Sequence, residues 1–274
     1  MTFELEKADS QEFARWWVVY RNANEDFSQS FKEQYQDVID VPFCHWLLLD
    51  GQRVGGLIRV GINIGDFFLI SPFTDAYSAL KAVLPADGKL VAQGILSEHV
   101  EAFQLLGFQI KESRRWMLRP TQAYDVSFEF QRMTPQVEHT DAIAQLMFDA
   151  FDGTVGQYGM RDVEAHRNSV ENYFETIETD DIFHRGSSAL FDGDKMVGAC
   201  LVQQFKTIGT IRFVVTHPDY QRRGIARRLM QYGINTIKAD YDYVGLAVTI
   251  GSPAQGLYRS MGFVSGVMMH TLTR

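Results

Sequence analysis

The spacing of apolar residues changes abruptly in the C-terminal half of this chain, and the change predicts two elements. Residues 210–216, TIRFVVT, are mostly β-branched or aromatic and contain no breaker, so they predict a buried strand. Pro218 then turns the chain. From Arg222 onward the pattern becomes helical, because apolar or small residues recur at every fourth position: Ile225, Leu229, Gly233 and Ile237. The sequence therefore predicts a strand, a turn and a helix in direct succession.

A second helix is predicted near the middle of the chain. Residues 128–151 have the pattern of a strand that leads into a helix. Thr140 or Asp141 has a side chain suited to cap this helix at its N-terminus. Its buried face is predicted from the apolar residues at helical spacing, which are Ile143, Leu146, Met147, Ala150 and Phe151.

The chain repeats part of its own pattern. Residues 91–108 align without a gap with residues 246–263, and the identical pairs, 155 positions apart, are Ala92/Ala247, Ile95/Ile250, Ser97/Ser252, Gly107/Gly262 and Phe108/Phe263. Upstream, residues 47–56 resemble residues 189–199, since each has an apolar run, an Asp-Gly turn and a second apolar run. That pattern is typical of a β-hairpin.

Two copies of one folding unit follow from these matches. We expect the boundary between them near Pro120, which follows a strand-like RRWML segment, and we divide the chain into domains of residues 1–122 and 123–274. The first copy is 12 residues shorter between its two matches, and the missing stretch falls where the second copy has HPDYQRRGIARRLM, residues 217–230. The alternative is a first domain of a different fold whose match is a coincidence.

The composition excludes several classes of protein. With 274 residues and 22% charged side chains, the chain has an ordinary globular composition, and its net charge of -8 argues against nucleic-acid binding. No uncharged apolar run approaches the roughly 20 residues that cross a membrane. The N-terminus lacks a basic start followed by an apolar stretch, so we expect a cytoplasmic protein. Cys44 and Cys200 lie in apolar segments, which favours buried thiols over a disulfide or a metal site.

Positive charge is concentrated at the turn between the strand predicted at residues 210–216 and the helix predicted from Arg222 onward. Four arginines lie there around Gly224, at positions 222, 223, 227 and 228. A helix N-terminus has free backbone N–H groups and the positive end of the helix dipole, and together these bind anions. Glycine lets the backbone approach such an anion closely. The nucleoside triphosphate loop G-x-x-x-x-G-K-[ST] is absent from the sequence. A solvated basic helix face is the alternative interpretation.

Two motifs carry a resemblance to a known family. The pattern V-x-x-P-x-x-Q-x-x-G-x-A, from Val215 to Ala226, resembles the pyrophosphate loop of the GCN5-related N-acetyltransferases, or GNAT family. Residues 252–263, SPAQGLYRSMGF, resemble the family's later motif, in which a short helix carries a tyrosine and ends in a Gly-Phe pair. With the hairpin near Asp192, the resemblance covers roughly residues 128–274. It implies an α/β fold of two tandem acyl-CoA N-acyltransferase (GNAT-like) domains, each a mixed twisted sheet flanked by helices.

The resemblance also implies a cosubstrate, acetyl-CoA, whose pyrophosphate the turn binds through backbone amides. Val214 and Val215 would bind the pantetheine arm and the thioester oxygen. Ser252 stands where many relatives have an asparagine. The residues implied to bind acetyl-CoA are Val214, Val215, Gln221, Arg222, Arg223, Gly224, Ile225, Ala226, Arg227 and Ser252.

Tyr258 matches the position of the family's general acid. A phenol, with a pKa of about 10, is protonated at neutral pH and can protonate a leaving thiolate. A ring that only packs in the core is the alternative. The attacking amine also needs a base, yet residues 210–217 contain no carboxylate. His217, beside Pro218, is more typical of a turn, so no base is assigned.

The first copy lacks the arginine turn and has Phe103 in the place of Tyr258, so the resemblance implies a degenerate, non-catalytic domain. From Glu138 to Asp181 the chain has eleven acidic and two basic residues, in the region that, with the loop at residues 152–162, forms the family's acceptor side. We therefore expect an N-acetyltransferase for a primary amine, a cationic small molecule. The alternatives are a non-catalytic CoA-binding regulatory module and an O-acyl or longer-acyl transferase on the same fold. The sequence gives no indication of the oligomeric state.

Overall fold

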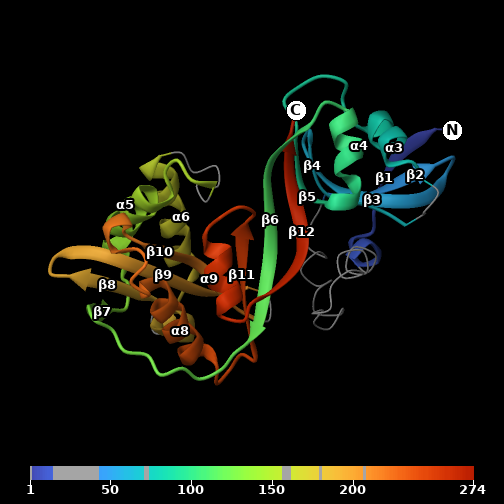
Figure 1. The fold of residues 1–274 in the computed structure, drawn as a ribbon. Helices are drawn as coiled ribbons and strands as arrows, with labels where there is room; N and C mark the ends of the chain where they lie inside the picture. Colours follow the sequence, from blue (N-terminus) through green and yellow to red (C-terminus); the bar gives the residue numbers. More distant parts are fainter. Residues whose placement is uncertain (1, 15–42, 71–73, 156–161, 179–180, 206–207) are drawn as a thin grey trace. The chain divides into compact units, whose positions relative to one another are not determined.

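The computed structural model describes residues 2–14, 43–70, 74–155, 162–178, 181–205 and 208–274. The chain divides into two units (Figure 1). Unit 1 consists of Met1–Arg115 together with Gly266–Arg274, and unit 2 consists of Trp116–Ser265. The division therefore cuts two long strands, β6 and β12, so that each of them contributes residues to both units.

Unit 1 contains a sheet in which β4 pairs parallel with β5, whereas the pairs β1–β2, β2–β3, β3–β4 and β5–β12 are antiparallel. Among the described residues of this unit, the helices α3 (Ala76–Val83) and α4 (Val100–Leu105) accompany the sheet. The strand order is β1 (Phe3–Lys7), β2 (Cys44–Leu49), β3 (Gln52–Val60), β4 (Asn63–Leu69), β5 (Val91–Leu96), β12 (Val264–Thr273) and the first part of β6 (Gln109–Pro120).

Unit 2 repeats this plan, again with one parallel pair, β10 with β11. Its strand order is β7 (Gln131–Met133), β8 (Ser188–Asp192), β9 (Lys195–Phe205), β10 (Ile208–Thr216), β11 (Tyr243–Thr249) and the last part of β6. Its helices are α5 (Thr140–Phe151), α6 (Val163–Thr176), α7 (Ile182–Gly186), α8 (Ile225–Ile237) and α9 (Ala254–Ser260).

Helices cover both faces of the sheet in unit 2, and strand β9 shows this residue by residue. Cys200 and Val202 belong to the hydrophobic cluster that contains the buried residues of α8 and α9. Ala199 and Leu201, which alternate with them and point to the other face, belong to the cluster of α5 and α6. A central strand that is buried on both faces defines an α/β layered architecture. The predicted fold class is therefore confirmed.

Both predicted hairpins are present. In the first, Asp50 and Gly51 join β2 to β3 with positive φ angles of 49° and 78°, as a tight two-residue hairpin turn requires. In the second, Gly193 has a φ of 59° between β8 and β9. The cysteines lie in strands as predicted, and burial raises the pKa of the Cys200 thiol to about 12.

Two predicted helix starts are wrong in detail. Helix α8 begins at Ile225 rather than at Arg222, because residues 222–224 form the turn before it. Helix α5 begins at Thr140 with His139 as its N-cap, since a 3₁₀ turn at residues 137–139 precedes it. The Thr140 hydroxyl donates backward to the carbonyl of that turn instead of capping the helix.

Among the described helices, none is long and apolar enough to span a membrane.

Each unit contains one strand from the other sequence copy. Strand β12, at the end of the second copy, pairs antiparallel with β5 of unit 1 and places Leu272, which is 0% exposed, in that unit's core. Strand β6, at the end of the first copy, brings Met117, 1% exposed, into the core of unit 2. The units thus differ from the expected ranges 1–122 and 123–274 by these exchanged strand ends.

The strand exchange predicts where two core substitutions act. Truncation of a buried Leu or Met to Ala costs about 2–5 kcal/mol. Leu272→Ala should therefore speed amide hydrogen exchange in β5, about 180 residues away in sequence, and Met117→Ala should speed it in β11. Hydrogen exchange followed by mass spectrometry checks both. Each variant serves as the control for the other, and an opposite pattern would contradict the assignment of these residues to the two cores.

Candidate functional site

The chain turns sharply between the end of β10 and the start of α8. A 3₁₀ turn at residues 218–220 follows the strand, and then Arg222, with a φ of 66°, and Gly224, with a φ of 79°, adopt left-handed conformations. Gly224 is the N-cap of α8 and has no side chain with which to cap the first helical turn. The N–H groups of that turn have no partner inside a helix. Successive N–H groups in such a turn form a concave anion site.

The space beside Gly224 is open. A Cβ atom added there would have one neighbour within 4 Å, the guanidinium carbon of Arg228 at 4.0 Å. Residues 221–224 are exposed, so a ligand can reach their backbone. A glycine at this position therefore both permits the left-handed turn and leaves the approach to the N–H groups clear.

The turn is fastened to the β8–β9 hairpin by an aromatic side chain. The Tyr220 hydroxyl donates to Asp192 Oδ2 at 2.8 Å, and this hydrogen bond raises the pKa of Tyr220. Lys195 Nζ and the Arg223 guanidinium each lie 5.4 Å from the centroid of the Tyr220 ring, within cation–π range. The β8–β9 hairpin thus holds the turn in place through Tyr220.

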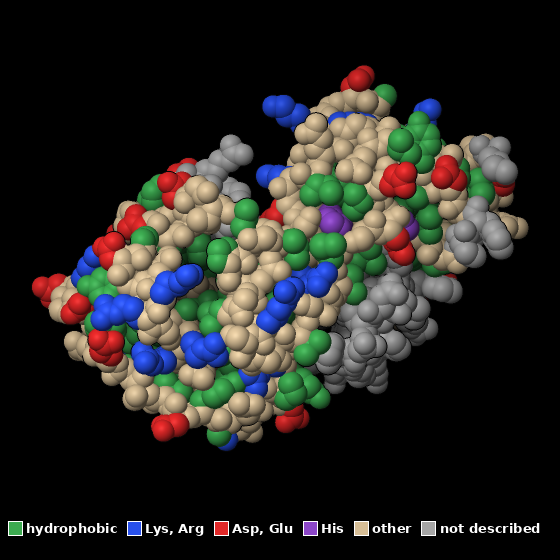
Figure 2. All heavy atoms as spheres, viewed as in Figure 1, with side chains coloured by type: hydrophobic (Ala, Val, Ile, Leu, Met, Phe, Trp, Pro, Cys, Tyr) green, Lys and Arg blue, Asp and Glu red, His purple; other side chains and the backbone are tan. Residues whose placement is uncertain are grey.

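The arginines around the turn differ in what they bind. Arg223 Nη2 lies 3.2 Å from Glu129 Oε1, so its charge is paired with a carboxylate. Arg227 donates to Ser260 Oγ at 2.6 Å, and Arg228 donates to a backbone carbonyl at 3.4 Å. Both of these acceptors are uncharged, so Arg227 and Arg228 leave net positive charge at the start of α8. Figure 2 shows Lys and Arg side chains gathered over α8 and α9.

Strand β10 separates from β11 soon after the two strands begin. Within the described residues, their parallel pairs are 209–210 with 244–245, whereas β10 pairs with β9 as far as its last residue. The ladder with β9 shifts around Arg212, the mark of a β-bulge. Val214, half-buried, and Val215, buried, follow the bulge. Their backbone on the β11 side lies beyond the parallel ladder, where it can bind an extended ligand.

Arg212, which sequence reasoning missed, joins the bulge to helix α6. Its guanidinium donates to Gln203 Oε1 at 2.7 Å, to Asn172 Oδ1 at 3.0 Å and to the Ser169 carbonyl at 3.3 Å. Burial lowers the pKa of Arg212. The signal in the sequence was a charged residue inside the otherwise uncharged run 210–216.

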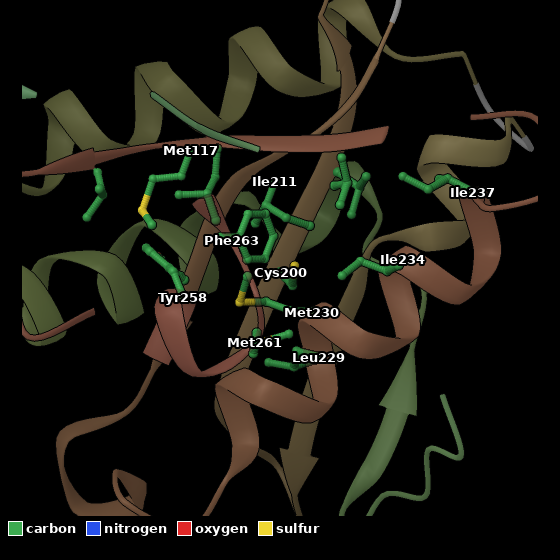
Figure 3. Packing of buried hydrophobic residues seen from close by; sticks show 14 of the residues in the cluster. Met117, Cys200, Ile211, Leu229, Met230, Ile234, Ile237, Tyr258, Met261 and Phe263 are labelled. Atoms are coloured by element: carbon green, nitrogen blue, oxygen red, sulfur yellow. The ribbon is translucent and has the colours of Figure 1, made fainter. Parts of the chain in front are cut away.

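Tyr258 lies almost buried, 8% exposed, in the cluster between the sheet and helices α8 and α9 (Figure 3). Its ring meets that of Phe263 edge-on at 6.1 Å. Ser252, two residues before α9, accepts the N–H of Ala254 at 3.3 Å. The hydroxyl of Ser252 therefore stabilises the start of the helix that carries Tyr258.

His217 has the turn role that its neighbour Pro218 indicates. Its Nδ1 accepts the N–H of Asp219 at 3.2 Å and so caps the 3₁₀ turn. This use of the ring nitrogen agrees with the sequence-based preference for a turn residue over a base.

Some of the acidic residues of the Glu138–Asp181 region surround a hollow of about 410 Å³ beside α6. Its lining combines the carboxylates of Glu171 and Glu175 with polar and apolar side chains, namely Gln136, Val137, Phe174, Ile177 and His184. Residues 156–161 of the predicted acceptor loop lie outside the described residues.

Unit 1 shows the same local structures without the open turn. Asp75 caps α3 by accepting the N–H of Ser78 at 2.9 Å, and hydrogen bonds from the side chain and the backbone of Ser78 lower the pKa of Asp75. A carboxylate of the chain itself thus occupies this helix N-terminus. Phe103, 0% exposed, meets Phe108 edge-on at 5.3 Å.

The backbone confirms the repeat at this turn. Phe108 N–H donates to the Phe103 carbonyl at 3.1 Å, and Phe263 N–H donates to the Tyr258 carbonyl at 3.0 Å. The intervening glycines, at positions 107 and 262, have φ angles of 85° and 83°.

Among the described residues, no group of three or more His, Cys, Asp or Glu side chains is placed to hold a metal ion.

Comparison with known proteins agrees with this geometry. Residues 185–265 match the family model of the acetyltransferase (GNAT) domain. Among solved structures, a GCN5-related N-acetyltransferase from Sphaerobacter thermophilus is similar with a TM-score of 0.68 and 16% identity, over 99% of this chain and 95% of that one. A GNAT-family acetyltransferase from Colwellia psychrerythraea has a TM-score of 0.60 and 10% identity, over 100% and 99% of the two chains.

A tandem GNAT protein from the clavulanic acid biosynthesis pathway is also similar, with a TM-score of 0.51 and 12% identity over 99% of this chain and 98% of that one. No curated protein sequence matches this chain. The structural likenesses show the fold, and the family model identifies residues 185–265 as part of a GNAT acetyltransferase domain. The chain therefore has the fold of these tandem proteins, and the segment that matches the acetyltransferase (GNAT) domain model lies in unit 2.

Proposed function

We propose that this protein is an acetyl-CoA-dependent N-acetyltransferase that acetylates a primary amine, a cationic small molecule. The observation that carries the proposal is the exposed left-handed turn at Arg222–Gly224, which opens helix α8 inside the segment that matches the GNAT domain. The pyrophosphate of acetyl-CoA fits this site, because free N–H groups and nearby guanidinium groups suit its two negative charges, one on each phosphate.

The proposed cosubstrate site uses backbone groups of two elements. Val214 and Val215 would bind the pantetheine arm where β10 has left β11, and residues 221–227 would hold the pyrophosphate. Ser252 would act indirectly, by holding the start of α9. The acetyl thioester supplies the electrophilic carbonyl; the chain's part is to bind, orient and exchange protons.

Tyr258 is the proposed proton donor to the leaving thiolate. Direct attack by an amine forms the amide bond and breaks the C–S bond, so the sulfur must take up a proton and the amine must lose one. A phenol held against a hydrophobic cluster stays protonated at neutral pH. No described carboxylate or histidine is assigned as the base that accepts the amine proton.

Unit 1 is proposed to be non-catalytic. Its helix α3 is capped by Asp75, and Phe103 takes the place of the proposed acid Tyr258. The expected division at residues 122 and 123 then separates a supporting copy from a catalytic one, apart from the exchanged strands. The buried thiols of Cys44 and Cys200, which form no disulfide in the described chain, fit a cytoplasmic location.

The first test is the stoichiometry and location of cosubstrate binding. Calorimetry should give one acetyl-CoA per chain. Gly224→Glu should abolish binding, because its carboxylate would pair with Arg228 in the space where a phosphate would sit. Gly51→Glu is the matched control, since Gly51 also has a positive φ, 78°, with no atom within 4 Å of an added Cβ. Two equivalent sites, or equal loss in both variants, would contradict the proposal.

The second test concerns the proton donor. Tyr258→Phe keeps the ring in the cluster and removes the hydroxyl. We expect kcat to fall by roughly 10²–10⁴ while the Kd for acetyl-CoA changes less than a few-fold. Single-turnover kinetics should confirm that the loss lies in the chemical step. An unchanged chemical rate would show that Tyr258 only packs, and acetyl-CoA binding without turnover of any amine would favour the regulatory module instead.

The third test concerns the acceptor. Attraction between a cationic amine and the acidic region of residues 138–181 weakens with salt, because the screening length falls from about 10 Å at 0.1 M to about 3 Å at 1 M. The KM for the amine should rise with ionic strength at a fixed pH well below the amine's pKa. The KM for acetyl-CoA, held also by backbone N–H groups, should rise less. An unchanged KM, or a best acceptor with net negative charge, would contradict a cationic substrate.

A further inference from the structure

A buried arginine from the first sequence copy lies inside the unit that carries the proposed proton donor. Arg119, 7% exposed, is near the end of β6 and belongs to unit 2. Its guanidinium donates to the Met261 carbonyl and to the Tyr124 hydroxyl, and its Nε donates to the Pro120 carbonyl at 2.9 Å. It also lies over the ring of Phe263, 5.9 Å from the centroid. These contacts hold Arg119 in one place.

The carbonyl that Arg119 binds closes the helix of Tyr258. Met261 is the C-cap of α9, a helix of 7 residues, and its own N–H donates to the Tyr258 carbonyl. Carbonyl groups at a helix C-terminus carry partial negative charge and lack partners within the helix, so a guanidinium there stabilises the helix end. Because α9 has about two turns, a restraint at its C-cap also restrains the position of Tyr258.

The same interaction occurs in unit 1, at the position 155 residues later. There the arginine comes from the second sequence copy and the helix from the first. Arg274, at the end of the second copy, donates to the Leu106 carbonyl at 3.1 Å in unit 1 and lies over the ring of Phe108, 5.0 Å from its centroid. Leu106 is the C-cap of α4, as Met261 is the C-cap of α9. In unit 1 the helix so capped carries Phe103, which has no hydroxyl.

We propose that Arg119 is a positioning residue for acetyl transfer: through the C-cap of α9 it holds Tyr258 where the leaving sulfur must be protonated. The inference rests on the proposed function of Tyr258. It gives the first copy a defined role, because the end of its last strand completes the catalytic unit. Met117, two residues earlier on the same strand, packs in the cluster of Tyr258 (Figure 3).

The size of the effect follows from the geometry that proton transfer needs. Misplacement of a reacting group by about 1 Å can cost about 10²-fold in rate. Lysine at position 119 would keep the charge but lose the planar group that binds Met261 and Tyr124 through Nη1 and the Pro120 carbonyl through Nε. Arg119→Lys should therefore lower kcat about 10–100-fold, with the Kd for acetyl-CoA within a few-fold of the wild type.

Arg274→Lys is the matched control, because it removes the same planar group from the corresponding cap in unit 1. It should leave kcat within two-fold and affect unit 1 alone. Tyr124→Phe removes one of the three acceptors of Arg119 and leaves the arginine, so it should lower kcat in the same direction by a smaller factor. Equal losses of kcat in Arg119→Lys and Arg274→Lys would overturn the inference, since general destabilisation would then explain both.

A double-mutant cycle separates positioning from stability. If Arg119 acts through the Tyr258 hydroxyl, Arg119→Lys should cost little further kcat in a Tyr258→Phe background. A loss that multiplies in full with that of Tyr258→Phe would overturn the inference.

Hydrogen exchange gives a readout that does not depend on turnover. The amides of residues 254–263 should exchange faster in Arg119→Lys and at the wild-type rate in Arg274→Lys. Unchanged protection of these amides in Arg119→Lys would overturn the inference even in an active enzyme. A wild-type protein that acetylates no amine would instead contradict the proposed function, while the exchange rates still report whether Arg119 holds the helix of Tyr258.

Discussion

A sheet that lacks one of its strands leaves a row of backbone hydrogen-bonding groups and part of its core in contact with water. In this chain each unit is completed by a strand from the other sequence copy, β12 in unit 1 and β6 in unit 2. The side chains that these strands deliver, Leu272 and Met117, are almost fully buried. The core of each unit, the cap of its last helix and, in unit 2, the surroundings of Tyr258 all depend on this exchange.

Local signals in the sequence were sufficient for the hairpins and for the turn before α8. An Asp-Gly pair between apolar runs and a glycine before an apolar stripe act over a few residues, so no distant contact can alter them much. The cap of α5 was predicted wrongly because two conformations compete within one turn: Thr140 can cap a helix, but here the 3₁₀ turn at 137–139 takes its hydroxyl instead.

The exchange of strands could not be predicted in this way. The sequences of β6 and β12 indicate strands but contain nothing that selects one sheet over the other. The repeat places Arg119 and Arg274 in corresponding positions. The carbonyl groups that they bind, however, can be identified only from the three-dimensional structure. The site divides similarly: the turn of Gly224 was predictable from a short motif, whereas Arg212, the hollow at Glu171 and any base depend on segments that meet across the fold.

The strand exchange also orders events during synthesis. A ribosome produces the chain from its N-terminus, and most domains fold as they emerge. Unit 2 has all of its residues once position 265 has been made, but unit 1 still lacks Gly266–Arg274. Its strand β5 must wait for β12, and the paired backbone hydrogen bonds of Leu90 with Arg274, at 2.8 and 3.0 Å, form after that. The half that is translated first is thus the half that can be completed last, and until then the edge of β5 is open to a chaperone or to another nascent chain.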